Sequence, residues 1–121
     1  MNVKSELTRN DVIFFMDMID SVWSPNFKPQ IFKQKPYYKI LNQKNSDDYK
    51  RFLGVYKAIR HVLTERELTV LDEIYGVDKE GSQLKTIAAI LNISPERVRQ
   101  ISKEAENKLA KKLLSQIKKC N

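Results

Sequence analysis

Residues 84–101 read LKTIAAILNISPERVRQI, and this stretch decides the fold. Its two short amphipathic segments are separated by Asn92, a residue type that tolerates the left-handed backbone of a tight turn. Ala88 is small at the point where a second helix has to approach the first. Ser94 followed by Pro95 is typical of a helix start, since serine caps free amide groups and proline suits the first helical position. The apolar positions available to hold the two helices together are Ile87, Leu91, Ile93, Val98 and Ile101.

This pattern predicts a helix-turn-helix, with an ordinary helical hairpin as the alternative. The second helix would contact DNA, because turning Val98, Ile101 and Ala105 inward leaves polar side chains on its outer face. Arginine pairs with guanine, glutamine with adenine, and glutamate accepts a hydrogen bond from cytosine, so these residue types suit the reading of bases. A solvated polar face, which every surface helix has, is the competing interpretation. The predicted DNA-binding residues are Lys85, Thr86, Ser94, Glu96, Arg97, Arg99, Gln100 and Lys103.

Outside this stretch the sequence predicts further helices and no strand. Thr64 and Glu67 have the spacing of a capping box, and the helix that they open should end at Gly76. Residues 10–23 and 47–63 are amphipathic at helical spacing, with Asn10 and Ser46 as their expected N-caps. Three prolines between Ser24 and Pro36 make the intervening connector extended or turning.

The sequence thus predicts an all-α fold in two parts. Residues 1–62 would form a helical N-terminal region with a connector rich in proline, lysine and aromatic residues. Residues 63–121 would form the helix-turn-helix domain, its last helix extending from Pro95 to about Lys119. An apolar stripe on that helix would either pack on residues 10–63 or form the seam of a homodimer. The stripe consists of Leu109, Leu113, Leu114 and Ile117.

Composition argues against an enzyme. The 121 residues include three glycines and one histidine, too few for a glycine-rich phosphate loop or a histidine-based metal site, so no cofactor is expected. The single cysteine, Cys120, excludes a disulfide within the chain and fits a reducing cytoplasm. No apolar run is long enough for a membrane span, and residues 1–20 lack the layout of a signal peptide. We therefore expect a cytoplasmic, nucleoid-associated protein.

The charge is uneven along the chain. The net charge is +7 overall, with −2 over residues 1–20, +7 over 21–60, −4 over 61–80 and +6 over 81–121. Two basic blocks separated by an acidic one indicate that part of the surface meets a polyanion and another part meets something else. A basic surface without any partner is the alternative.

Five short motifs fall in one register. They are LTERE at 63–67, YG at 75–76, IA at 87–88, RVRQI at 97–101, and Ala105 followed by KL at 108–109. Together they make residues 63–109 resemble region 4 of bacterial sigma factors. Small chains of this kind also resemble sigma-like regulators that phages and mobile elements encode.

The resemblance implies partners. It implies that the second helix binds the minus-thirty-five element of double-stranded promoter DNA. It also implies that the preceding helices contact the flap of the β subunit of bacterial RNA polymerase. Each of the residues so placed has a simple role in the core as its alternative. The residues expected to face polymerase are Leu68, Leu71, Ile74 and Tyr75.

The chain departs from the family pattern at two positions. Pro95 stands where many members have a base-contacting arginine, so the preferred DNA sequence should differ from the usual one. Glu106 stands where a leucine often follows the buried alanine, so the packing beyond Ala105 should differ.

The resemblance implies that a complete sigma factor would also carry an aromatic, basic region that opens the minus-ten element, and we expect residues 1–62 to be too few for it. The aromatic residues of the connector would either stack on unpaired bases or belong to the core. They are Trp23, Phe27, Phe32, Tyr37 and Tyr38.

The sequence therefore predicts a sigma-like transcription regulator that binds promoter DNA and contacts RNA polymerase. The alternative is an interaction protein, anti-sigma-like or an appropriator, that occupies polymerase or a sigma factor without reading DNA. Pro95 and the acidic segment 61–80 favour this alternative slightly.

Overall fold

The computed structural model describes residues 7–29, 35–77 and 81–119, with side chains up to Gln116. Cys120, Phe32 and the side chain of Ile117 lie outside the described residues. Within these ranges the chain is helical and has no strand, which confirms the predicted all-α class. The elements are α1 (Arg9–Met18), η1 (Pro36–Lys39), α2 (Asp47–Ile59), η2 (Arg60–Val62), α3 (Glu65–Tyr75), α4 (Leu84–Leu91) and α5 (Pro95–Lys119), where η marks a 3₁₀-helix.

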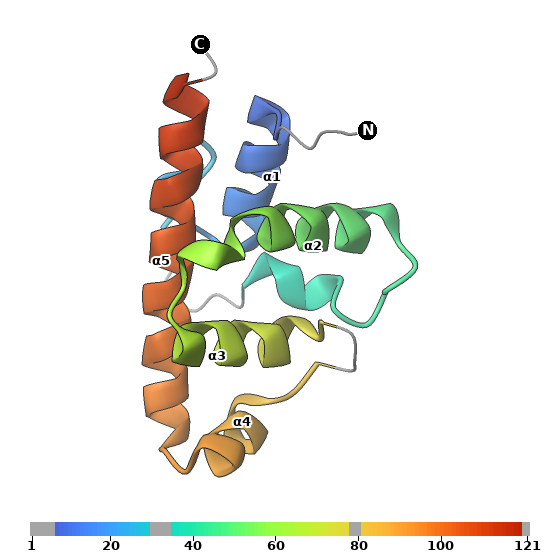
Figure 1. Cartoon of the computed structure of the whole chain (residues 1–121). Helices are drawn as coiled ribbons and strands as arrows, with labels where there is room; N and C mark the ends of the chain where they lie inside the picture. The colour runs from blue at the N-terminus through green and yellow to red at the C-terminus, as the bar shows by residue number, and fades with distance from the viewer. Residues whose placement is uncertain (1–6, 30–34, 78–80, 120–121) are drawn as a thin grey trace.

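Helix α5 runs the whole length of the molecule (Figure 1). Helix α1 lies beside its C-terminal half, α2 and α3 cross it one below the other, and α4 meets its N-terminal end. Leu109 and Leu113, both on α5, are completely buried. The described leucines of the apolar stripe therefore pack into the core that α5 shares with the N-terminal region, as one of the two interpretations predicted. Leu109 and Leu113 are not available to a dimer seam.

The first helix does not begin where it was predicted. Asn10 is not its N-cap, because Thr8 fills that position and forms a capping box with Asp11. The Thr8 hydroxyl accepts from the Asp11 amide at 3.1 Å, and the Asp11 carboxylate accepts from the Thr8 amide at 3.2 Å. Because this exchange satisfies two free amides, it is preferred over a cap two residues later. The helix ends at Met18, short of the predicted 23, since the chain turns through Asp20 with φ of 56°.

Most helix boundaries after α1 lie at the capping residues that the sequence predicted. Ser46 caps α2 as predicted, although the α-helix ends at Ile59 and continues as η2. Thr64 and Glu67 form the predicted capping box at the start of α3. Gly76 ends α3 in the left-handed conformation, with φ of 71° and ψ of 45°. Helix α4 and the start of α5 also lie where the sequence placed them.

One hydrophobic core spans both predicted parts of the chain. Phe52 of α2 stacks on Phe15 of α1, with ring centroids 4.8 Å apart, and meets the edge of Tyr75 of α3 at 4.9 Å. Tyr37 of the connector also packs against Tyr75, at 5.0 Å. The predicted boundary at residues 62/63 therefore does not divide the core. Tyr37 is a core residue, whereas Trp23 keeps 43% of its surface exposed.

None of the helices in the described ranges combines the length and the apolar character that crossing a membrane requires.

Candidate nucleic-acid interface

Helices α4 and α5 form the predicted helix-turn-helix. Asn92 takes the left-handed conformation, with φ of 58° and ψ of 46°, and the next amide, of Ile93, donates to the Ala88 carbonyl at 3.0 Å. Ala88 is buried, with 3% of its surface exposed, and its small side chain lets the two helices approach. Ile87 and Val98 are completely buried on the facing sides of the two helices. The turn thus fixes which face of α5 points outward.

The outward face of α5 carries the predicted reading residues. The described structure exposes Glu96, Arg97, Arg99, Gln100 and Lys103. Arg99 and Glu96 form a bidentate pair, with Nε donating to Oε2 at 3.0 Å and Nη2 to Oε1 at 2.5 Å. Hydrogen bonding to Glu96 and its charge raise the pKa of the Arg99 guanidinium. Arg97 donates to the Gln100 amide oxygen at a longer 3.4 Å.

The remaining predicted DNA-binding residues lie at the ends of the two helices. Lys85 and Thr86 are exposed in the first turn of α4, where a helix N-terminus favours phosphate. Ser94 is exposed as well, but its hydroxyl accepts from the Arg97 amide at 3.0 Å as the cap of α5. The structure therefore brings together basic and amide side chains from α4 and α5 around one turn.

Comparison with known proteins agrees with this geometry. Residues 61–111 match the family described as sigma-70, region 4. They form a sigma region 4-like segment. No match was found among curated proteins or among solved structures. The segment is a sigma-factor-like, DNA-binding helix-turn-helix domain of the kind used in transcription regulation, and its family is regulatory rather than enzymatic.

Within the region 4-like segment, the residues expected to face polymerase separate into two groups. Leu71, Ile74 and Tyr75 are buried, with at most 1% of their surface exposed. Their side chains fill the core between α3 and its neighbours, which was the alternative role for each. Among these four residues, Leu68 is half-buried.

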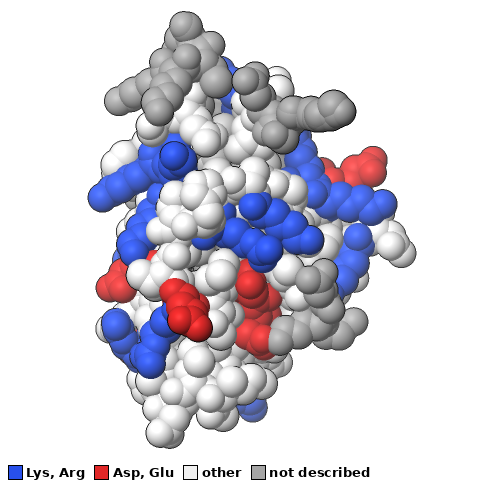
Figure 2. All heavy atoms as spheres, viewed as in Figure 1, with Lys and Arg blue, Asp and Glu red and all other residues white. Residues whose placement is uncertain are grey.

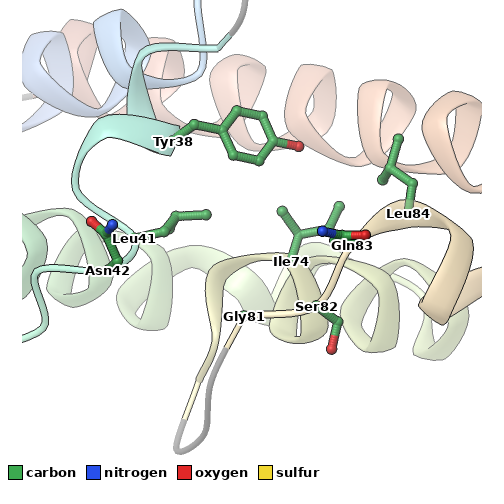
Figure 3. A pocket seen from close by; sticks show the side chains of 8 residues that line it. All are labelled: Tyr38, Leu41, Asn42, Ile74, Gly81, Ser82, Gln83 and Leu84. Carbon is green, nitrogen blue, oxygen red and sulfur yellow. The ribbon is translucent and has the colours of Figure 1, made fainter.

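Ile74 nevertheless lines a groove at the edge of the region 4-like segment (Figure 3). Tyr38 and Leu41 enter this hollow from the connector, and Ile74 and Leu84 enter it from the segment. Its volume is about 390 Å³. The remaining lining residues are Asn42, Gly81, Ser82 and Gln83. Sequence reasoning missed this groove, because no local pattern shows that the connector meets the loop before α4.

A second hollow, of about 350 Å³, continues from the groove toward the reading face. It shares Tyr38 and Leu84 with the groove and reaches Arg99 and Lys103 on α5. Lys35 of the connector also lines it. The connector therefore lies next to the reading face of the region 4-like segment.

Glu106 shows how the packing beyond Ala105 departs from the family pattern. Its carboxylate is buried, with 3% of its surface exposed, and accepts from the Tyr75 hydroxyl at 2.5 Å. Lys35 lies 3.3 Å from Oε1 and also donates to the Ile19 carbonyl at 2.7 Å. Burial raises the pKa of the Glu106 carboxyl, against the opposing effect of Lys35. This cluster joins the connector, α3 and α5 at one point.

Proposed function

We propose that this chain is a transcription regulator that recognises promoter DNA through α4 and α5 and contacts RNA polymerase. The observation that carries the proposal is the exposed reading face of α5 in a segment that matches sigma-70 region 4. Arginine and glutamine on one outward face are the residue types that pair with guanine and adenine in the major groove. Lys85 and Thr86 supply contacts to the phosphates beside them.

The pairing of Glu96 with Arg99 is compatible with this role. Both side chains are more than half exposed, at 58% and 66%, so water screens the pair and its net contribution is small. Arg99 can therefore exchange the carboxylate for a base at little cost. Glu96 would then be released to accept from a cytosine amino group.

The reading face is tested by single substitutions. Arg99→Ala and Gln100→Ala are each expected to weaken binding to a duplex selected from a random pool by roughly 5- to 150-fold, because each removes one base contact. Fluorescence anisotropy measures the affinity, and Arg9→Ala is the control, since Arg9 is exposed on α1. Unchanged affinity in both variants would remove α5 as the reading helix.

We propose that polymerase binds in the groove of Figure 3 through an apolar helix such as that of the β flap. The groove offers the half-buried side chains of Tyr38, Leu41 and Leu84. The buried Ile74, which was predicted to face polymerase, completes its apolar lining. Half-buried leucine and tyrosine side chains that line a groove suit the apolar face of an amphipathic helix.

Leu41→Asp tests this contact, because it places a charge in the groove at a half-buried position. Capture of RNA polymerase from nuclease-treated bacterial lysate is expected to fall about 30-fold. Ile90→Asp is the matched control, since Ile90 is apolar, 62% exposed and outside the groove. Equal capture of polymerase by the two variants would contradict binding in the groove. Reduced capture by Ile90→Asp alone would indicate that polymerase contacts α4 instead.

The second candidate is an interaction protein that binds polymerase or a sigma factor without reading DNA. The acidic segment 61–80, with a net charge of −4, and Pro95 at the start of α5 favour it. A DNA reader with several phosphate contacts loses roughly a thousandfold or more in affinity between low and moderate salt. Polymerase capture without any salt-dependent DNA binding would support this second candidate.

A further inference from the structure

A hollow on α2 lies outside the region 4-like segment and has no part in the proposed reading face. Its volume is about 300 Å³. Three lysines surround it, Lys50 and Lys57 from α2 and Lys44 from the loop before that helix. Tyr49, Leu53 and Gly54 complete its lining.

The hollow is strongly cationic. Among the described residues that line it there is no acidic side chain, and Lys50 and Lys57 are both exposed. They lie on one side of α2, separated by about two helical turns. The surrounding residues 21–60 carry a net charge of +7, the most basic part of the chain. Figure 2 shows Lys and Arg gathered across the middle of one face, at the height of α2 in Figure 1.

Gly54 leaves the surface of α2 open at this place. It lies in the interior of α2, where glycine is less favourable than alanine. A Cβ atom at Gly54 would meet nothing within 4 Å, and its φ is not left-handed, so neither packing nor backbone conformation requires glycine. Its effect is to leave the helix backbone open between the two exposed lysines. Glycine at such a position allows close approach of a ligand to the backbone.

The chemistry of the lining favours phosphate groups over bases. The one aromatic residue that lines the hollow, Tyr49, is buried, with 4% of its surface exposed, and offers no face on which a base can stack. Lysines around an open backbone suit the regularly spaced phosphates of a duplex, which are bound without regard to sequence.

We propose that the α2 hollow binds the phosphate backbone of double-stranded DNA, as a second contact surface in addition to the reading face of α5. Helix α3 lies between α2 and α4, so the two surfaces are distinct (Figure 1). The inference adds to the proposed function by giving the N-terminal region a DNA contact of its own. It does not depend on base reading by α5.

The test uses the full chain and a duplex of arbitrary sequence, with anisotropy measured over a salt series. The double variant Lys50→Ala/Lys57→Ala is expected to lower the slope of log affinity against log salt by about 2, since two phosphate contacts are lost. Arg9→Ala/Arg66→Ala removes the same charge from exposed positions on α1 and α3 and is the control. A slope equal to that of the control would overturn the proposal.

Gly54 gives a second variant that leaves the lysines in place. Gly54→Ala is expected to raise the melting temperature, because the helix gains propensity and the space is open. Gly54→Leu is expected to fold as well but to bind the duplex several-fold more weakly, because its side chain fills the hollow. Duplex binding by Gly54→Leu equal to that of the unchanged chain would contradict the proposal.

Two further comparisons distinguish duplex-backbone binding at α2 from binding of single-stranded DNA and from base reading by α5. A larger loss with the lysine variant on single-stranded DNA than on duplex DNA would overturn the assignment to duplex backbone. On a duplex selected from a random pool, the lysine variant should keep the ratio of specific to arbitrary-sequence affinity, whereas Arg99→Ala should lower it. If neither Arg99→Ala nor Gln100→Ala lowers this ratio while the lysine variant lowers the salt slope, base reading by α5 is refuted and the α2 surface stands.

Discussion

Replacing Phe52 by alanine is expected to lower the free energy of unfolding by about 3–5 kcal/mol, the usual cost of removing a fully buried aromatic ring. The ring of Phe52 has no exposed surface. It contacts Phe15 of α1, Tyr37 of the connector and Tyr75 of α3, with centroid distances of 4.8, 5.7 and 4.9 Å. Because these contacts link elements on both sides of residue 62, the whole chain should lose stability together.

Urea denaturation followed by far-ultraviolet circular dichroism and by Trp23 fluorescence measures this effect. Coincident transitions with the two probes are expected in both the unchanged chain and the variant. Leu53→Ala is the control, since Leu53 is the next residue of α2 but only half-buried, and its effect should be clearly smaller. Two separated transitions, with the N-terminal region unfolding first, would instead support independent domains at residues 1–62 and 63–121.

Replacing Glu106 by leucine, the residue common in the sigma region 4 family at this place, is expected to destabilise the chain by about 2–4 kcal/mol. The substitution leaves the buried Tyr75 hydroxyl without its acceptor and Lys35 without its carboxylate. Lys35 is one-third exposed and can turn to water, so most of the cost should come from Tyr75. Thermal unfolding of the single variant measures the loss.

Adding Tyr75→Phe tests whether most of the destabilisation by Glu106→Leu comes from the unpaired Tyr75 hydroxyl. In the Glu106→Leu background it removes the stranded hydroxyl and should recover about 1–2 kcal/mol, whereas in the unchanged chain the same substitution should destabilise. The double-mutant cycle thus gives the coupling between Tyr75 and Glu106. A coupling near zero would show that the hydrogen bond contributes nothing to stability.

The raised pKa of Glu106 also predicts how stability depends on pH. Its ordinary value is 4.5, and burial raises the pKa of the carboxyl in the folded chain. Above 4.5 the unfolded chain loses this proton before the folded chain does, so the folded state binds more protons and stability falls with rising pH until the raised pKa is passed.

Glu106→Gln removes this titration while retaining an acceptor for Tyr75. The melting temperature of the unchanged chain should therefore fall more steeply with pH than that of the variant, between about pH 5 and the raised pKa. Circular dichroism melts over a pH series give the comparison. Parallel curves would mean that Glu106 has the same pKa in the folded and unfolded chains.

The sequence by itself determined the helices and turns of the region 4-like segment. The capping box of Thr64 and Glu67 and the left-handed Asn92 are local features, since the groups that interact are a few residues apart and one conformation satisfies them. The outward face of α5 followed from the same local periodicity. Even the error at Asn10 was local, because Thr8 and Asp11 offered a more complete exchange of hydrogen bonds nearby.

Only the tertiary structure decided which residues from distant parts of the chain contact one another. The burial of Leu71 and Tyr75, the groove between Leu41 and Ile74, and the pairing of Glu106 with Lys35 all join segments far apart in the chain. Helical periodicity gives the direction of a side chain from its own helix axis, but not which neighbour covers that face or at what angle. Packing of the connector against α3 and α5 supplies that information, and so it separates core residues from those left for a partner.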